Sequence, residues 1–178
     1  ALSSGMLLYG ASLVYGFAGT TAYADIAASL NDDVSVGITV GMVFLLSGLA
    51  FKISAAPFHM WTPDVYEGAP TPVTALFAIV PKVAAMTLIM NVTYFAFSGI
   101  SDQWSQILIA LSVASMIIGV TGAIMQHNIK RMLAYSSIAH MGYALAGLAA
   151  GTSEGAAAVV IYMTTYVFMG AGAFSIII

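Results

Sequence analysis

Residues 34–58 read VSVGITVGMVFLLSGLAFKISAAPF, and Lys52 is the only charged side chain in this run. About 20 consecutive apolar residues are enough to cross the hydrocarbon core of a bilayer as a helix. The run therefore predicts a transmembrane helix. A charge at the position of Lys52 is costly in such a helix, so we expect this lysine to face a water-filled interior.

The rest of the chain has the same character. Of its 178 residues, 61% are hydrophobic and 6% are charged, which is too little polar surface for a soluble globule or a conventional soluble enzyme. The chain has no cysteine, which excludes disulfides, thiolate metal sites and cysteine-bound iron–sulfur clusters within it. The formal net charge of −3 gives no indication of nucleic-acid binding.

Division of the chain at clusters of charged residues, Gly and Pro predicts six apolar segments of about 20 residues each. They are residues 1–19, 34–58, 72–97, 104–125, 132–150 and 155–178. The chain begins and ends within apolar segments and has no start methionine. We therefore expect residues 1–178 to be a single membrane domain and a fragment of a longer protein. The predicted fold is an all-α, polytopic membrane helix bundle.

The distribution of charge predicts the orientation of the bundle. Lys130 and Arg131 lie in the turn 127–131, whereas the loops after the first, third and fifth segments contain acidic residues and no basic ones. These acidic residues are Asp25, Asp32, Asp33, Asp102 and Glu154. Because basic residues favour the cytoplasmic side, we expect the turn 127–131 and the loop 62–71 to be cytoplasmic. Lys130 and Arg131 would anchor the fold to that face.

Three proton-capable side chains are predicted to share one layer of the membrane. Lys52, Lys82 and His140 each lie about nine or ten residues from the cytoplasmic loops, which corresponds to a depth of roughly 13 to 15 Å. A lysine at the bilayer centre is unfavourable by roughly 2.5 to 3.5 kcal/mol, and such residues usually handle ions or protons. The layer therefore indicates a proton- or ion-translocating site.

Two prolines lie close to the lysines. Pro57 clashes with the carbonyl four residues before it, so we expect the second segment to be broken or kinked near Lys52. Pro81 is expected to free the carbonyl of Phe77, one turn before Lys82. Interrupted helices at mid-depth are typical of ion-translocating sites, and freed carbonyls can solvate an ammonium group.

These features lead to a proton-relay hypothesis. If Lys52 and Lys82 lie on adjacent helices about 8 to 10 Å apart, one or two waters would connect them, and a proton on one would repel a proton from the other. The alternative for each lysine is snorkelling to the interface or pairing with a partner helix. His140 is either a relay or a neutral histidine bonded to a carbonyl or hydroxyl group. His59, beside the loop, is a weaker candidate.

Asp64 and Glu67 lie in the proline-rich loop 62–71. Acidic side chains there can cap the next helix, bind a neighbouring subunit or attract protons, and we favour capping or subunit contact. No His/Asp/Glu cluster in the sequence has metal-ligand spacing, and no glycine-rich nucleotide loop is present.

Two blocks of sequence carry a family resemblance. Residues 51–72, FKISAAPFHMWTPDVYEGAPTP, and residues 128–143, NIKRMLAYSSIAHMGY, closely resemble the signatures of the antiporter-like membrane subunits of bacterial NADH:quinone oxidoreductase (respiratory complex I), of the subunit N type. The resemblance extends over essentially the whole chain and includes the separation of Lys52 from Lys82.

The resemblance implies a fold of fourteen helices with two inverted repeats. This chain would be helices six to eleven, with Lys52 on the broken seventh helix and Lys82 on the eighth. In the family, the first of these lysines pairs with a glutamate on the fifth helix, and the second passes protons toward a lysine on the twelfth. Both partners lie outside this chain.

The function that the resemblance implies is proton translocation, driven by quinone reduction elsewhere in the complex and relayed through Lys52, Lys82 and His140. The partners would be the lipid bilayer and the other membrane subunits of complex I, in the bacterial inner membrane. The complex would use NADH, FMN, iron–sulfur clusters and quinone, with none of them bound by this chain.

Two other functions remain open at this point. One is a subunit of the related multi-subunit sodium/proton antiporters, which share the lysines but exchange cations. The other is a structural membrane spacer whose lysines only hold helices together, in which case paired apolar replacement of the lysines would be tolerated.

Overall fold

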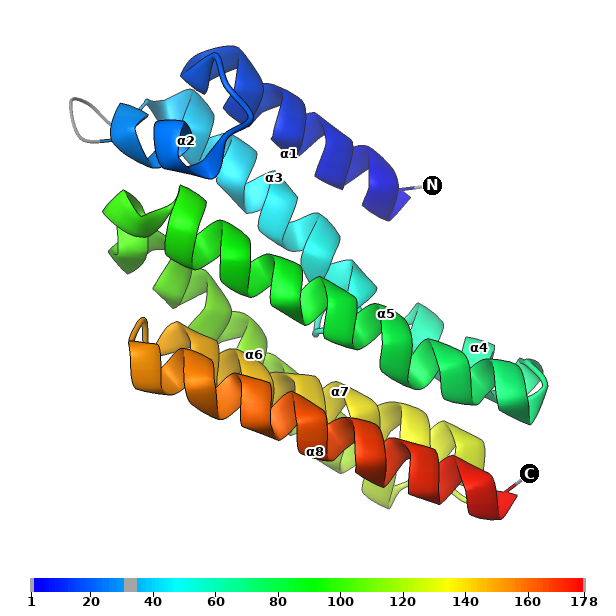
Figure 1. Ribbon diagram of the computed structural model, residues 1–178. Helices are drawn as coiled ribbons and strands as arrows, with labels where there is room; N and C mark the ends of the chain where they lie inside the picture. Colours follow the sequence, from blue (N-terminus) through cyan, green and yellow to red (C-terminus); the bar gives the residue numbers. More distant parts are fainter. Residues whose placement is uncertain (1, 31–34, 178) are drawn as a thin grey trace.

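The computed structural model describes residues 2–30 and 35–177, and within these ranges the chain is helical and without strands (Figure 1). Asp32 and Asp33, two of the acidic residues used above for orientation, lie outside the described residues. The long helices are α1 (Leu2–Ala18), α3 (Val36–Lys52), α5 (Thr71–Asn91), α6 (Ser101–Ile124), α7 (Ile129–Ala149) and α8 (Ser153–Ile177). Shorter pieces are the α-helices α2 (Tyr23–Ser29) and α4 (Trp61–Gly68), the π-helical turn Val92–Ala96 and the 3-10 turn Ser98–Ile100.

The six predicted segments correspond to the six long helices. By length and composition, the stretches Thr71–Ala96, Ser98–Ile124 and Ser153–Ile177 are apolar and long enough to cross a membrane. Helices α1 and α3 are apolar but shorter, at 17 residues each. The prediction of an all-α membrane helix bundle is confirmed.

The second predicted segment, 34–58, differs most from the structure. Helix α3 ends at Lys52, residues 53–60 form turns, and helical structure resumes in α4 at Trp61. The predicted break near Pro57 is therefore confirmed, whereas most of the predicted loop 62–71 is in fact the helix α4. Pro81 lies inside α5, which runs unbroken through it.

Side chains at the helix starts explain several of the boundaries. Ser35 accepts a hydrogen bond from the Gly37 N–H at 3.1 Å and so caps α3. Asn128 Oδ1 accepts from the N–H groups of Lys130 and Arg131, at 2.9 and 3.3 Å, and so caps α7. The predicted turn 127–131 is thus shorter than expected, because α7 already begins at its third residue.

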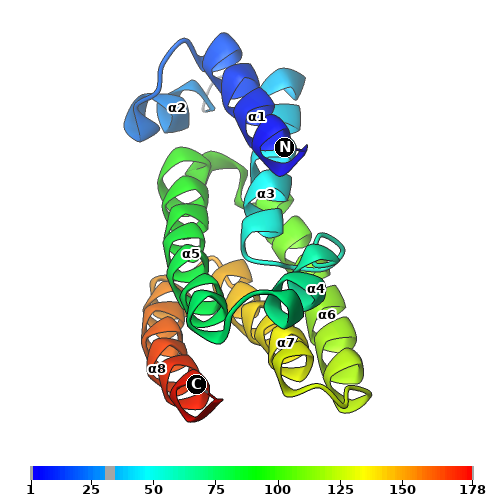
Figure 2. The ribbon, with the colours of Figure 1, turned by 90° about the vertical axis from the view of Figure 1, so that its right-hand side faces the viewer.

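Helix α5 lies between two packed groups of helices (Figure 2). On one side α1 packs along α3, and on the other α6 packs along α7 with α8 next to them. Both close pairs depend on glycine. A Cβ on Gly10 would lie 2.6 Å from the Leu45 backbone nitrogen, and one on Gly119 would lie 2.5 Å from that of Ala139. The absence of a side chain permits this approach.

Candidate functional site

Lys82 lies on α5 and is fully buried, with 0% of its surface exposed. Its ammonium Nζ donates a hydrogen bond of 2.6 Å to the hydroxyl of Ser137 on α7. That hydroxyl in turn donates to the Ala134 carbonyl at 2.7 Å. Nζ also lies 5.4 Å from the ring centroid of Tyr66 on α4. The burial contradicts the alternative that Lys82 snorkels to the interface.

No carboxylate among residues 2–30 and 35–177 forms an ion pair with Lys82. A buried charge without a counter-ion is costly and needs other polar partners. A hydroxyl oxygen and an aromatic face are the partners available here, and both are neutral. This is an environment in which a lysine exchanges its proton more readily than beside a fixed carboxylate.

His140 lies on α7, three residues after Ser137 and on the same side of the helix. Its Nδ1 is 2.6 Å from the hydroxyl of Tyr162 on α8, and its ring centroid is 5.5 Å from that of Tyr166. The ring is half-buried. His140 is therefore hydrogen-bonded to a hydroxyl group. This geometry suits a proton relay and equally a neutral histidine with a structural role.

A pocket of about 220 Å³ between α5, α7 and α8 is lined by His140 and by Ser137, the hydrogen-bond partner of Lys82. It is lined by Ala78, Leu133, Ser136, Ser137, His140, Tyr166, Met169, Gly170, Ala173 and Phe174. A water molecule takes up about 30 Å³ in the liquid, so several waters fit. Ser137, which binds Lys82, thus faces the same space as the imidazole of His140.

Lys52, by contrast, is exposed, because the described residues of this chain do not enclose it as they enclose Lys82. It is the last residue of α3 and lines a pocket of about 320 Å³ with Phe51, Trp61, Val65, Phe77 and Pro81. No ion pair to Lys52 is present among the described residues.

The two lysines face different directions. Pro81 on α5 lines the pocket of Lys52, whereas Lys82, the next residue, points toward Ser137. Consecutive residues on an α-helix are about 100° apart around the axis. The structure therefore gives no direct polar contact between the lysines, and the route from Lys82 runs toward α7 and α8.

The break between α3 and α4 is held by three side-chain hydrogen bonds. Trp61 Nε1 donates to the Phe51 carbonyl at 3.1 Å, Thr62 donates to the Ser54 hydroxyl at 2.6 Å, and the Ala56 N–H donates to Ser115 at 2.8 Å. The Phe51 carbonyl next to Lys52 is thus bonded to an indole rather than to an ammonium. His59 lies in the break with a buried Nδ1 that has no partner in the described part of the chain.

Asp64 and Glu67 on α4 both bind Arg131 at the start of α7. Arg131 Nη1 is 2.7 Å from Asp64 Oδ1 and 2.9 Å from Glu67 Oε2. Arg131 lies just outside the predicted membrane segment 132–150. Its hydrogen bonds to Glu67 and Asp64 raise the pKa of its guanidinium. The expectation that the acids cap the next helix is wrong, because the cap of α5 is Pro70 and no side chain bonds there.

The neighbouring polar residues strengthen the same α4–α7 contact. Asn128 Nδ2 donates to Glu67 Oε1 at 3.1 Å, and Lys130 Nζ donates to the Ala69 carbonyl at 2.8 Å. Lys130 and Arg131 therefore tie two elements of the chain to one another. This is a more specific contact than the general anchoring that was expected from their charge.

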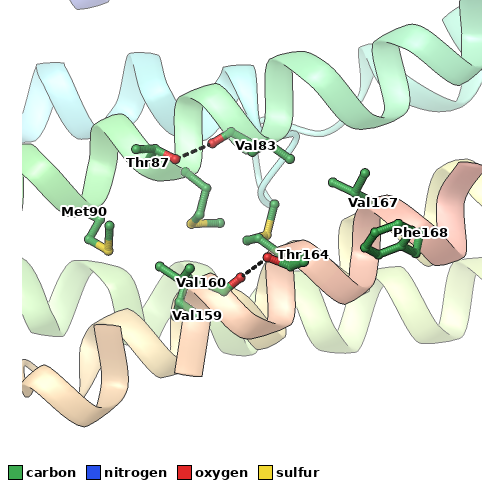
Figure 3. A pocket seen from close by; sticks show the side chains of 10 residues that line it. Val83, Thr87, Met90, Val159, Val160, Thr164, Val167 and Phe168 are labelled. Carbon is green, nitrogen blue, oxygen red and sulfur yellow. Dashed lines mark hydrogen bonds between the residues drawn. The ribbon is translucent and has the colours of Figure 1, made fainter. Parts of the chain in front are cut away.

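A second pocket between α5 and α8, of about 300 Å³, is apolar (Figure 3). Its only hydroxyl-bearing residues, Thr87 and Thr164, donate to carbonyls of their own helices, those of Val83 and Val160, at 2.9 and 2.8 Å. No polar group is left to order water there, so this pocket is unsuited to carry protons.

Sequence reasoning missed the residues that surround Lys82 and His140. These are Tyr66, Ser137, Tyr162 and Tyr166. The sequence does contain a clue to Ser137, because Ser137 lies about one helical turn before His140 and therefore on the same side of the helix. The tyrosines had none, because aromatic residues are common throughout an apolar chain and only the packing of α4, α7 and α8 brings them together.

The comparisons with known proteins agree on one family. The family model described as "NADH:quinone oxidoreductase/Mrp antiporter, TM" matches residues 1–178. NADH-quinone oxidoreductase subunit N of Parvibaculum lavamentivorans is 59% identical over 179 residues, and that of Rhodospirillum rubrum is 56% identical over 180 residues. Each match covers 100% of this chain and 37% of the relative, so the chain spans little more than a third of the length of these proteins.

Two solved structures are similar in fold. The Mrp complex from Dietzia sp. aligns with a TM-score of 0.88 and 29% identity, over 97% of this chain and 32% of that one. Respiratory complex I from Thermus thermophilus aligns with a TM-score of 0.78 and 35% identity, over 99% of this chain and 37% of that one. The chain therefore belongs to the antiporter-like, multi-pass membrane family of NADH:quinone oxidoreductase and Mrp subunits, and it is similar to subunit N.

Proposed function

We propose that this chain is part of a proton-translocating membrane subunit of NADH:quinone oxidoreductase, of the subunit N type. The observation that carries the proposal is the buried Lys82, bonded to Ser137 beside a pocket that also contains His140. The alignment with subunit N over the whole chain supports the choice of complex. The energy would come from quinone reduction elsewhere in that complex.

The proposed proton route begins at Lys82. When Lys82 is charged, the Ser137 hydroxyl accepts one of its N–H groups, as the structure has it. Water in the pocket of about 220 Å³ would receive the proton as the lysine becomes neutral. His140 can accept a proton on one ring nitrogen and release one from the other, and Tyr162 holds the ring in place at Nδ1.

Lys52 would act on Lys82 through its charge. It lies beside a different face of α5 from the one that carries Lys82, so the two lysines would be coupled by local electrostatics rather than by a shared hydrogen bond. Formation or opening of an ion pair at Lys52 would change the proton affinity of Lys82. The resemblance assigns the partner, a glutamate, to a helix outside this chain.

The expected location and partners follow from the same proposal. The subunit would lie in the bacterial inner membrane among other membrane subunits of complex I, and that complex would use NADH, FMN, iron–sulfur clusters and quinone. The contact of Arg131 with Asp64 and Glu67 supports a common side for the turn 127–131 and residues 62–71, which we assign to the cytoplasm. The site draws on α4, α5, α7 and α8, which supports a single domain.

The test is Lys82→Ala in the full-length subunit within its assembled complex. Proton pumping and quinone reduction would be measured side by side in sealed vesicles, with the amount of complex in the membrane as the control for assembly. We expect both activities to be lost at normal assembly, since pumping and electron transfer are tightly coupled. Wild-type rates of both activities would favour a structural membrane spacer instead.

A second candidate is a subunit of a multi-subunit sodium/proton antiporter. The close structural likeness to the Mrp complex supports it. The two candidates differ in their ion. Transport that depends on sodium concentration would favour the antiporter, and sodium-independent proton pumping would favour complex I.

A further inference from the structure

Tyr66 is in contact with Lys82 although it lies on a different helix. It is fully buried on α4, with 0% of its surface exposed, and its ring centroid is 5.4 Å from the ammonium Nζ. A cation within about 6 Å of an aromatic ring is attracted by the negative face of the ring, most strongly where water is absent. Lys82 is in this situation, because it too is fully buried.

The ring of Tyr66 is held mainly by packing. Its hydroxyl is buried near the Ser137 side chain but makes no hydrogen bond of normal geometry within residues 2–30 and 35–177. The ring packs with Ala78, Ala134 and Phe174, which belong to α5, α7 and α8. Two of these neighbours are alanines, and their small side chains leave room for a tyrosine at the junction of four helices.

The two neighbours of Lys82 come from the two helices that the Arg131 cluster joins. We use "Arg131 cluster" for Arg131, Asp64 and Glu67. Asp64 and Glu67 lie on either side of Tyr66 in α4, and Arg131 lies six residues before Ser137 in α7, about 9 Å along the helix axis. The cluster therefore joins the helix that carries Tyr66 to the helix that carries Ser137.

We propose that Tyr66 is a positioning residue for Lys82: its ring holds the ammonium against the Ser137 hydroxyl, and the Arg131 cluster keeps α4 in register with α7 so that the ring stays in place. This inference rests on the proposed function, because it assumes that Lys82 carries protons. In the absence of the ring, the charged lysine would lose one of its two stabilising contacts and would no longer be directed toward Ser137.

Two substitutions separate the ring from the hydroxyl. Tyr66→Phe keeps the ring and removes the hydroxyl, whereas Tyr66→Leu removes the ring and keeps an apolar side chain. The measurement is the rate of proton pumping in sealed vesicles, divided by the amount of assembled complex in the membrane. Because it is a ratio, it reports on the complexes that have assembled even if a variant lowers their amount.

We expect Tyr66→Phe to pump as the wild type does. Tyr66→Leu should pump about fivefold less per assembled complex, the ratio to which about 1 kcal/mol corresponds. Equal loss in the two variants, or no loss in Tyr66→Leu, would overturn the inference. Lys82→Ala is measured in parallel. If it pumps normally, the proposed function fails; if only Lys82→Ala loses pumping, the function stands and the role of Tyr66 does not.

The Arg131 cluster is tested by the double substitution Asp64→Asn and Glu67→Gln, which removes the charges but keeps the size of the side chains. The cluster is partly exposed, with 73% of the Asp64 side chain accessible, so we expect a smaller loss than in Tyr66→Leu. Combined with Tyr66→Leu, the double substitution should cause no further loss, because both act on one contact. Fully additive losses would overturn the role of the cluster.

Discussion

Lys52 and Lys82 are similar in sequence and different in structure. Each is a lone charge in an apolar segment, near a proline and at a similar predicted depth. In the structure Lys82 is fully buried and bonded to Ser137, whereas Lys52 is exposed at the end of α3. Depth along a helix therefore does not determine burial; the side of the helix and the number of neighbouring helices do.

Because the two lysines differ in burial, they are suited to different chemistry. Residues from α4 and α7 complete the surroundings of Lys82, and these partners are neutral, which suits a group that gains and loses a proton. Lys52 has no such enclosure among the described residues, and its charge can act only at a distance or on a partner elsewhere. Substitutions that affect the two lysines differently test this contrast.

The largest effect is expected from Lys82→Arg. Arginine keeps the positive charge but does not release its proton at accessible pH. Pumping should be lost as completely as in Lys82→Ala, measured as proton uptake in sealed vesicles. Lys130→Arg, at a half-buried lysine outside the Lys82 site, is the matched control. Normal pumping by Lys82→Arg would contradict a titrating role.

The next largest effect is expected from Ser137→Ala, which removes the hydrogen-bond acceptor of the Lys82 ammonium. A hydrogen bond to a charged group is worth about 1.5 to 3 kcal/mol, so the rate of pumping per assembled complex should fall about tenfold or more. Ser136→Ala is the control, because Ser136 lines the same pocket and does not bind Lys82. If both variants pump at the same rate, Ser137 has no specific role in the proposed proton route.

His140→Gln should cause a partial loss of pumping, smaller than that of Ser137→Ala. The glutamine amide keeps a hydrogen bond to Tyr162 but does not titrate, and water in the pocket can carry part of the proton flow. The same vesicle assay measures it. Wild-type pumping by His140→Gln would make the histidine a structural group that orders Tyr162.

The smallest effect is expected from Lys52→Arg. If Lys52 acts through its charge, arginine preserves that action, and the open pocket beside Lys52 can accommodate the longer side chain. Pumping should stay within about twofold of the wild type, a change of less than about 0.5 kcal/mol. A loss as complete as that of Lys82→Arg would mean that Lys52 also titrates, and the contrast between the lysines would fail.

Much of the fold was predictable, because helix formation in this chain follows from local apolar composition. The six predicted segments match the six long helices to within a few residues, apart from the ends of the second and third, whose α-helices stop six residues earlier, at Lys52 and Asn91. The break near Pro57 was also predictable, since proline removes a backbone donor. The helical form of residues 61–68 was not, because their proline, glycine and acidic residues are typical of a loop.

The candidate site was predictable only in part. The sequence by itself determined that the chain is a membrane helix bundle with a broken helix, and that Lys82 and His140 are unusual in it, because charge and polarity are scarce in an apolar chain. Only the tertiary structure decided which lysine is enclosed, that Ser137 and Tyr66 enclose it, and that Arg131 joins their two helices. The physical reason is that hydropathy is a property of each segment, whereas burial, hydrogen bonds and ion pairs depend on which faces of distant segments meet.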